Sequence, residues 1–211
     1  MNFVSEEIEK YSTIHSESES ELLKKLYRET HLNVLNPRMI SGPLQGRILS
    51  FISKIINPNK ILEIGTFTGY STLCLAEGLQ KNGTIQTIEK NDELIEIQNK
   101  YFEKSSYRKN IFQLTGNALQ ILPTLNEKYD LIFLDADKKN YLTYLDLLIP
   151  KLKTKGILIT DNVLWNGKVL NKVKDTDSQI IDNFNKKVNS DKRLNSVMLP
   201  IRDGITFSMK V

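Results

Sequence analysis

Residues 60–72 read KILEIGTFTGYST, and this stretch decides the fold class. The apolar run 60–64 predicts a short buried strand, and residues 71–79 predict the helix that follows it. Gly65 and Gly69 lie between the two, where glycine allows a tight turn and lets the backbone approach a ligand closely. The stretch is therefore a strand, a glycine-containing turn and a helix whose N-terminus offers free N–H groups.

The alternation of strand and helix continues toward the C-terminus. Apolar runs predict further strands at 84–88, 111–114, 129–134 and 156–160. Helical spacing predicts helices at 92–102, 118–122, 141–148 and 176–189. Such alternation is typical of a doubly wound α/β fold with a mostly parallel sheet. The tail departs from it, because NSVMLPI and GITFSMKV predict an antiparallel hairpin at the sheet edge, turning through Arg202, Asp203 and Gly204.

The N-terminal part lies outside this alternation. Helical spacing extends from residue 5 to about residue 27, broken by HSESES, where Ser20 is a candidate helix cap. A further helix is expected at 44–56, after the turn residues of NPRMISGPLQG. We therefore expect a single domain over 1–211, with a helical extension and cap at 1–43 and the core at 44–211.

Composition indicates an ordinary soluble protein. The chain has 211 residues, of which 40% are hydrophobic and 26% charged, enough to bury a core. The net charge of +4 is dispersed, which favours a solvated surface, although a nucleic-acid footprint stays open. The single cysteine, Cys74, fits a reducing compartment. The N-terminus is acidic without a signal-peptide core, and no run of about 18 apolar residues occurs, so we expect a cytoplasmic protein away from membranes.

Two carboxylates near the glycine turn indicate the kind of nucleoside that would bind there. The turn has G-x-x-x-G rather than the G-x-G-x-x-G of dinucleotide-binding proteins. Glu63 would repel a pyrophosphate but could accept hydrogen bonds from an ammonium group. Glu89 ends the second strand, where a carboxylate can bind both hydroxyls of a ribose. These features favour S-adenosylmethionine; the alternative is that the glycines only make a tight turn and the carboxylates are solvated.

Oxygen-bearing side chains also end two later strands. Asp135 follows strand 129–134 in FLDADKKNY, and Asp161 and Asn162 follow strand 156–160 in GILITDNVLWNG. These strands would be neighbours, and ligands of α/β sheets lie beyond the carboxyl ends of the strands. Two carboxylates and an amide suit a divalent cation, best Mg²⁺, with Mn²⁺ or Ca²⁺ as alternatives. The competing interpretation is that the aspartates only cap helices. His15 and His31 lie in the N-terminal helices, which argues against zinc.

The chain resembles the metal-dependent class I S-adenosylmethionine O-methyltransferases, the group of caffeoyl-coenzyme A and catechol O-methyltransferases and their bacterial relatives. The resemblance runs from about Met39 to the C-terminus and is carried by LEIGTFTGYST, TIEKN, FLDADKKNY, DNVLWNGKV and RDGITFSMKV. It implies a seven-stranded Rossmann-like sheet with an antiparallel last strand, in agreement with the predicted hairpin, and a homodimer.

The resemblance also implies roles for individual residues. Asp135, Asp161 and Asn162 would bind the metal, and Lys138 would be the general base. The residues implied to bind the cofactor are Met39, Ser41, Glu63, Gly65, Thr66, Gly69, Ser71, Glu89, Gly116, Asn117, Ala118 and Asp135. Relatives often have an acidic residue or proline where this chain has Asn117, so the contact at the adenine edge differs here.

A lysine serves as a base only when it is deprotonated, so Lys138 could remove the proton provided that burial and the nearby cation depress its pKa toward neutrality. We expect Lys139 to point elsewhere and to be solvated. Trp165 could form an aromatic wall for a planar acceptor, or simply pack. The expected acceptor is a catechol-like vicinal diphenol. Alternatives are a coenzyme A thioester, a hydroxylated uridine of transfer RNA, or no reaction at all in a nucleotide-binding module.

Overall fold

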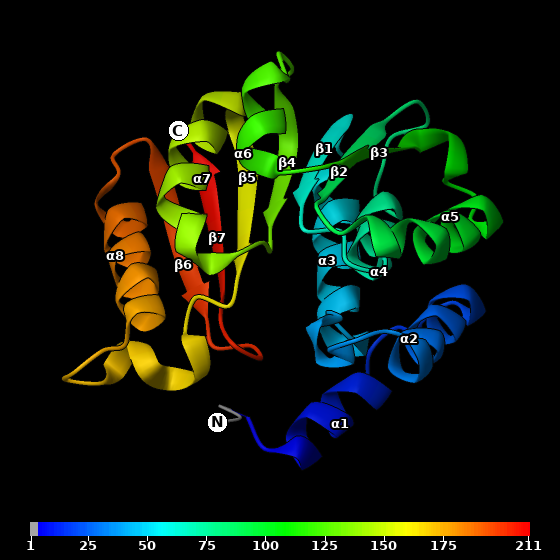
Figure 1. Ribbon diagram of the computed structural model, residues 1–211, viewed down its shortest axis with the longest axis horizontal. Coiled ribbons are helices and arrows are strands. Elements are labelled where there is room, and N and C mark those ends of the chain that lie inside the picture. The colour runs from blue at the N-terminus through cyan, green and yellow to red at the C-terminus, as the bar shows by residue number, and fades with distance from the viewer. Residues whose placement is uncertain (1–3) are drawn as a thin grey trace.

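A seven-stranded sheet in the order β3-β2-β1-β4-β5-β7-β6 forms the centre of the structure (Figure 1). The structure is a computed structural model that describes residues 4–211; the first three residues of the predicted N-terminal extension lie outside the described residues. The strands are β1 Lys60–Ile64, β2 Thr84–Glu89, β3 Ile111–Thr115, β4 Tyr129–Leu134, β5 Leu152–Asp161, β6 Leu194–Leu199 and β7 Ile205–Lys210.

Helices connect the strands and precede the sheet. The α-helices are α1 Glu6–Ile14, α2 Glu21–Asn33, α3 Pro43–Ile56, α4 Tyr70–Ala76, α5 Ile95–Lys104, α6 Ala118–Ile121, α7 Tyr141–Leu148 and α8 Thr176–Ser190. Short 3₁₀ helices are η1 Pro37–Met39, η2 Asp92–Leu94, η3 Arg108–Asn110, η4 Leu122–Thr124, η5 Lys138–Asn140, η6 Ile149–Lys151 and η7 Trp165–Leu170.

The predicted fold class is confirmed. β1 pairs in parallel with β2 and β4, and β4 pairs in parallel with β5. The C-terminal hairpin is present, and its second strand, β7, is antiparallel to both β5 and β6. β4 and β5 are thus neighbours, as expected, and the residues after them meet at one edge of the sheet.

Several predicted boundaries differ from the structure, and the largest difference is in α2, which continues to Asn33 although helical spacing predicts an end near residue 27. β5 begins at Leu152, four residues before the predicted start at Gly156. Its first part carries Lys153 and Lys155, whose charges interrupt the apolar pattern from which a strand is predicted. In the structure, Lys153 forms an ion pair with Asp130 of β4 at 2.8 Å. The predicted helix 71–79 ends at Ala76 as α4, because the chain then passes so close to α3 that a Cβ on Gly78 would lie 2.1 Å from the Ser53 carbonyl carbon.

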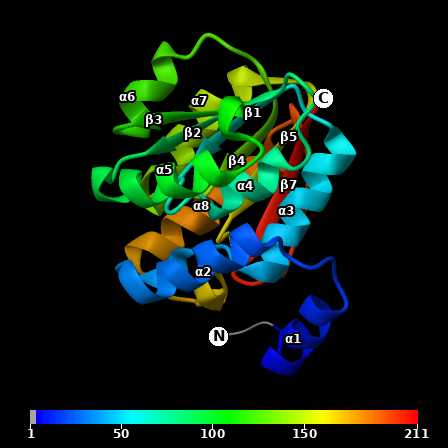
Figure 2. The same cartoon turned by 90° about the vertical axis from the view of Figure 1, so that its right-hand side faces the viewer.

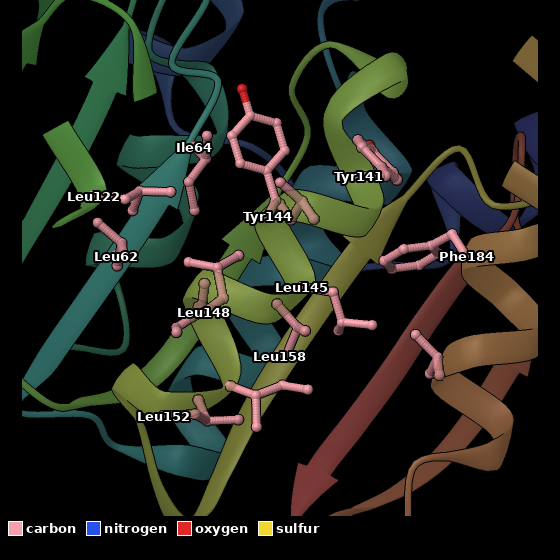
Figure 3. Packing of buried hydrophobic residues seen from close by; sticks show 14 of the residues in the cluster. Leu62, Ile64, Leu122, Tyr141, Tyr144, Leu145, Leu148, Leu152, Leu158 and Phe184 are labelled. Atoms are coloured by element: carbon pink, nitrogen blue, oxygen red, sulfur yellow. The ribbon is translucent and has the colours of Figure 1, made fainter. Parts of the chain in front are cut away.

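Two apolar layers hold the sheet between its helices. Helices α7 and α8 cover one face, and α3, α4 and α5 cover the other (Figures 1 and 2). Successive strand residues point to opposite faces, so Leu62 of β1 packs toward α7 while Ile61 packs toward α3 and α4. Figure 3 shows the first layer, where Leu145 and Leu148 of α7 lie beside Leu158 of β5. This burial makes the strand ends rigid supports for the loops that follow them.

The N-terminal helices differ in how they attach. α2 buries Leu23 and Leu26, and the predicted cap is confirmed, since Ser20 Oγ accepts a hydrogen bond from the backbone N of Leu23 at 3.3 Å. α1 buries none of its residues and leaves Ile8 and Tyr11 exposed. In Figure 1 both helices lie below α3 and α4. Across residues 4–211, none of the helices combines the length and apolar character needed to cross a membrane.

Candidate active site

A cleft of about 550 Å³ opens at the carboxyl ends of the central strands. Most of the predicted site residues line it: Met39, Ser41, Gly65, Thr66, Ser71, Glu89, Gly116, Asn117, Ala118, Asp135, Lys138, Asp161, Asn162 and Trp165. They come from segments far apart in the chain, and the parallel sheet brings them to one edge. Glu63 and Gly69 are the two predicted residues that do not line the cleft.

The glycine turn after β1 passes directly against the end of β4. Gly65 has φ +98, and a Cβ there would lie 1.9 Å from the carbonyl oxygen of Asp135, so no other residue fits. The backbone N of Asp135 in turn donates to the carbonyl of Ile64 at 2.9 Å. Gly69, at φ +89, caps α4, where a Cβ would lie 2.5 Å from the ring of Phe102. Gly69 therefore shapes the turn from behind instead of facing the cleft.

Glu63 is fully buried behind the cleft wall. Its carboxylate accepts hydrogen bonds from Ser71 Oγ at 2.5 Å, from Thr87 Oγ1 at 2.6 Å and from the hydroxyl of Thr72. Burial raises the pKa of Glu63 to about 7, against the effect of these three hydroxyl donors. We expected an ammonium group of the ligand to donate hydrogen bonds to Glu63, but hydroxyls of the protein are its donors. Of these three donors, only Ser71 lines the cleft.

Glu89 ends β2 at the rim of the cleft, as predicted. Its Oε2 accepts from the backbone N of Phe67 at 2.8 Å, and Oε1 accepts from the backbone N of Lys90 and of Asn91, both at 2.9 Å. Because a carboxylate has about four acceptor positions, Glu89 is fixed in direction and keeps acceptor capacity toward the cleft. Asn117 is engaged locally, since its Oδ1 caps α6 by accepting from Leu119 N at 2.9 Å.

Lys138 forms an ion pair with one of the two predicted carboxylate ligands, Asp135. Its Nζ donates to Asp135 Oδ1 at 2.8 Å and to Tyr141 Oη at 2.7 Å. The Tyr141 hydroxyl then donates to the backbone carbonyl of Asp161 at 3.1 Å. Burial disfavours the charged amine, but the negative charge of Asp135, with Tyr141 and Asp161, raises the pKa of Lys138 above its ordinary value. Burial alone therefore does not depress the pKa of Lys138, and the part of the condition that concerns the cation stays a prediction.

Asp161 is 4% exposed and is held at both carboxylate oxygens. Oδ1 accepts from the backbone N of Asn162 and Oδ2 from Gln45 Nε2, each at 2.7 Å. Burial raises the pKa of Asp161, and the charge of Asp135 adds to this effect. Two carboxylates that raise each other's energy form a favourable place for a cation.

The donor set fits a hard divalent cation if an amide completes it. Nowhere in residues 4–211 do three His, Cys, Asp or Glu side chains group in a way that could hold a metal ion. A site at the ends of β4 and β5 would therefore need Asn162 beside Asp135 and Asp161. All three line the same cleft, and oxygen ligands of this kind suit Mg²⁺ better than zinc.

The remaining predictions concern single side chains. Trp165 is half-buried; it lines the cleft and also packs on the apolar layer under α7 and α8, so its packing is confirmed and its role as an aromatic wall stays a prediction. Lys139 is exposed, as predicted. His15, which follows the end of α1, and His31 of α2 are exposed, and their Nδ1 atoms each contact a carbonyl four residues earlier at 2.9 Å.

Sequence reasoning missed three residues of this site. Tyr141 was assigned only to a helix, although it follows Lys138 at a spacing of three residues, which places both on one side of the chain. Arg202 lies in the RDG segment that we interpreted only as a turn. No sequence pattern connected Gln45 with the site, because 116 residues separate it from Asp161 in the sequence.

Comparisons with known proteins agree with this geometry. Residues 13–211 match a family model described as O-methyltransferase. The chain is 33% identical over 205 residues to a caffeoyl-CoA O-methyltransferase of Stellaria longipes, a match that covers 92% of this chain and 85% of the relative.

Solved structures with the same fold hold a nucleoside. An S-adenosylhomocysteine-bound methyltransferase from Podospora anserina has a TM-score of 0.90 at 27% identity, covering 97% of this chain and 94% of that one. An O-methyltransferase from Bacillus cereus, also in complex with S-adenosylhomocysteine, has a TM-score of 0.89 at 27% identity and covers 97% of each chain.

Proposed function

The chain belongs to the O-methyltransferase family, and we propose that it transfers a methyl group from S-adenosylmethionine to one hydroxyl of a catechol-like vicinal diphenol. The observation that carries the proposal is that one cleft joins the glycine turn and Glu89 to the cluster of Asp135, Lys138 and Asp161. A nucleoside end and an acid–base end within one cleft are what group transfer from a bound donor requires.

The nucleoside end supports S-adenosylmethionine as the donor. Two relatives of the same fold bind S-adenosylhomocysteine, the product that this donor leaves. In this chain the fixed carboxylate of Glu89 keeps about one acceptor position for a ribose hydroxyl, and the turn at Gly65 lets the ligand approach the backbone. Met39 and Ser41 would border the methionine part of the donor.

At the other end, Asp135, Asp161 and Asn162 would hold a divalent cation, most suitably Mg²⁺. When bound, such a cation supplies positive charge that lowers the pKa of hydroxyl groups beside it and of the Lys138 ammonium. Lys138 would first release its ammonium proton to solvent, and its neutral Nζ would then take the proton of the acceptor hydroxyl. The oxygen then forms a bond to the methyl carbon as the bond from carbon to sulfur breaks, which leaves a methyl ether and S-adenosylhomocysteine.

A second candidate acceptor is a hydroxylated uridine of transfer RNA. The observation that favours it is a groove between α2 and α5, lined by Lys25, Arg28, Lys100 and Lys104 around the ring of Tyr101. Cationic side chains suit phosphates, but Tyr101 is only 4% exposed and offers no ring face for an unstacked base. Part of this charge is already used, because Lys100 pairs with Glu29 at 2.6 Å.

Methylation assays separate these candidates. We expect the purified protein with S-adenosylmethionine and Mg²⁺ to methylate catechol, to leave phenol unmodified, and to lose activity in EDTA until Mg²⁺ is restored. Asp161→Ala should abolish turnover, whereas Asp177→Ala on the exposed start of α8 should not. Activity on catechol that persists in EDTA would remove the cation from the proposal. A modified nucleoside that disappears from transfer RNA when the gene is deleted, without activity on any diphenol, would favour the RNA acceptor.

A further inference from the structure

The carboxylate of Asp161 is oriented by a buried side chain from a distant helix. Gln45 lies in the first turn of α3 and is 1% exposed. Its Nε2 donates to Asp161 Oδ2 at 2.7 Å, while the backbone N of Asn162 donates to Oδ1 at 2.7 Å. Each carboxylate oxygen has two lone pairs, so each is fixed by one donor of the protein and keeps one lone pair for another partner.

Arg202 decides which way the amide of Gln45 points. Its Nη1 donates to Gln45 Oε1 at 2.8 Å. A guanidinium can only donate hydrogen bonds, so the amide oxygen must face Arg202 and the amide nitrogen must face Asp161. Without Arg202 the amide could turn over and present its oxygen to the carboxylate, which would repel it. The hydrogen bonds therefore run in one direction, from Arg202 to the Gln45 oxygen and from the Gln45 nitrogen to Asp161.

The same guanidinium also holds the segment that borders the other end of the cleft. Arg202 Nη1 donates to the backbone carbonyl of Ile40 at 3.2 Å. Ile40 lies between Met39 and Ser41, and all three line the cleft. One arginine in the C-terminal hairpin turn thus connects the segment expected to border the donor with the carboxylate expected to bind the cation.

We propose that Gln45 and Arg202 are positioning residues that hold Asp161 in its cation-binding orientation, and that Arg202 also positions the Met39–Ser41 segment. The inference rests on the proposed function, because it concerns the cation site of that reaction. Partners that orient a metal ligand commonly change metal affinity by about 10- to 100-fold when they are removed. Neither residue needs to contact the acceptor or the donor.

Isothermal titration with Mn²⁺ and with Mg²⁺ tests this inference without measuring turnover. Gln45→Met keeps the length of the side chain but removes its donor, and we expect cation affinity to fall about tenfold. Gln179→Met on the exposed surface of α8 is the matched control and should bind as the wild type does. Arg202→Met should weaken cation binding similarly, and the double variant should bind no more weakly than either single variant. Arg202→Lys, which retains a donor, should recover most of the affinity.

Binding of S-adenosylhomocysteine separates the two residues. Arg202→Met should weaken binding of S-adenosylhomocysteine severalfold, because Arg202, unlike Gln45, donates to the carbonyl of Ile40. Gln45→Met should leave this affinity within about twofold of wild type. Thermal unfolding without cation shows whether each variant is folded, and Arg202→Met keeps the test available if Gln45→Met does not fold.

The outcomes distinguish the inference from the function on which it rests. If the wild type binds neither cation, the proposed metal site is wrong and the inference falls with it. If the wild type binds a cation and both Gln45→Met and Arg202→Met bind it equally tightly, only the inference is overturned. A lower unfolding midpoint with unchanged cation affinity would assign these side chains a structural role and would also overturn it.

Discussion

The Nζ atom of Lys138 lies 2.8 Å from Oδ1 of Asp135, so the expected general base forms an ion pair with an expected metal ligand. The two side chains are 13% and 21% exposed, which leaves little water to screen the pair. In the protein alone, the ammonium of Lys138 acts as counter-ion to the buried carboxylates. Its role as a base therefore depends on what else binds at those carboxylates.

Replacing Lys138 should affect the chemical step more than donor binding. We expect Lys138→Met to lower kcat by about 10²- to 10⁴-fold, because that is the usual contribution of a positioned acid or base. The affinity for S-adenosylhomocysteine should stay within about twofold. Steady-state kinetics and calorimetry measure the two quantities, and Lys139→Met, at the exposed neighbour, is the matched control. A Lys138→Met protein with more than about a tenth of wild-type kcat would contradict the assigned role.

Glu89 should govern donor affinity. Three backbone N–H groups orient its carboxylate, so Glu89→Gln disturbs those donors and removes the charge that would accept a ribose hydroxyl. We expect the KM for S-adenosylmethionine to rise about 10- to 100-fold, since a hydrogen bond to a charged group is worth about 1.5–3 kcal/mol. kcat should change little. Glu93→Gln, at an exposed position in η2, is the control, and an unchanged KM in Glu89→Gln would refute the ribose contact.

Gly65 should be essential for packing the first turn against β4. An alanine there combines a positive φ with a contact of 1.9 Å to the Asp135 carbonyl, so we expect Gly65→Ala to lower the free energy of unfolding by more than about 3 kcal/mol. Gly42→Ala is a matched control, because Gly42 has φ +78 but the nearest atom to its Cβ would be 3.7 Å away. It should lose about 1–3 kcal/mol, because φ 78 and ψ 175 lie in a region that is essentially restricted to glycine. Urea denaturation measures the free energy of unfolding of both variants. Equal losses would mean that backbone strain alone, without the contact to Asp135, explains the need for glycine at position 65.

Glu63 should make stability depend on pH. Burial raises its pKa from 4.5 to about 7 in the folded protein. Between these pH values the folded state binds more protons than the unfolded state. The contribution of Glu63 to the free energy of unfolding is therefore fully present below about pH 4.5 and is lost as the pH rises through 7. Glu63→Gln does not titrate. Its free energy of unfolding, relative to wild type, should therefore rise by up to about 3 kcal/mol from pH 4.5 to pH 8.

Urea denaturation across this pH range measures the difference between Glu63→Gln and wild type. Glu93→Gln again serves as the control, because its side chain is exposed. Parallel pH profiles for Glu63→Gln and wild type would show that Glu63 does not titrate in this range.

The local elements were predictable wherever a short segment carries its own reason to form. β1 and β4 have the predicted bounds, because an apolar run that ends at a glycine or an aspartate marks a buried strand and its end. Ser20 caps α2 as predicted, since capping involves only residues three positions apart. The meeting of Asp135 and Asp161 in one cleft followed from the order of strands in a parallel sheet.

Other features depended on contacts between distant segments. Glu63 lies behind the cleft, where Thr72 and Thr87, from an adjacent helix and strand, donate hydrogen bonds to its carboxylate. The raised pKa of Lys138 comes from carboxylates that the sheet collects around it.

By itself, the sequence determined the sheet and its antiparallel hairpin, because apolar periodicity and turn residues act over short distances, and its resemblance to a known family implied most of the residues at the carboxyl edge. Only the tertiary structure decided that Arg202 and Gln45 hold Asp161, since they come from the C-terminal hairpin and the first turn of α3. The physical reason is that a hydrogen bond selects its partner by direction and distance in space, and neither is encoded in the spacing of residues along the chain.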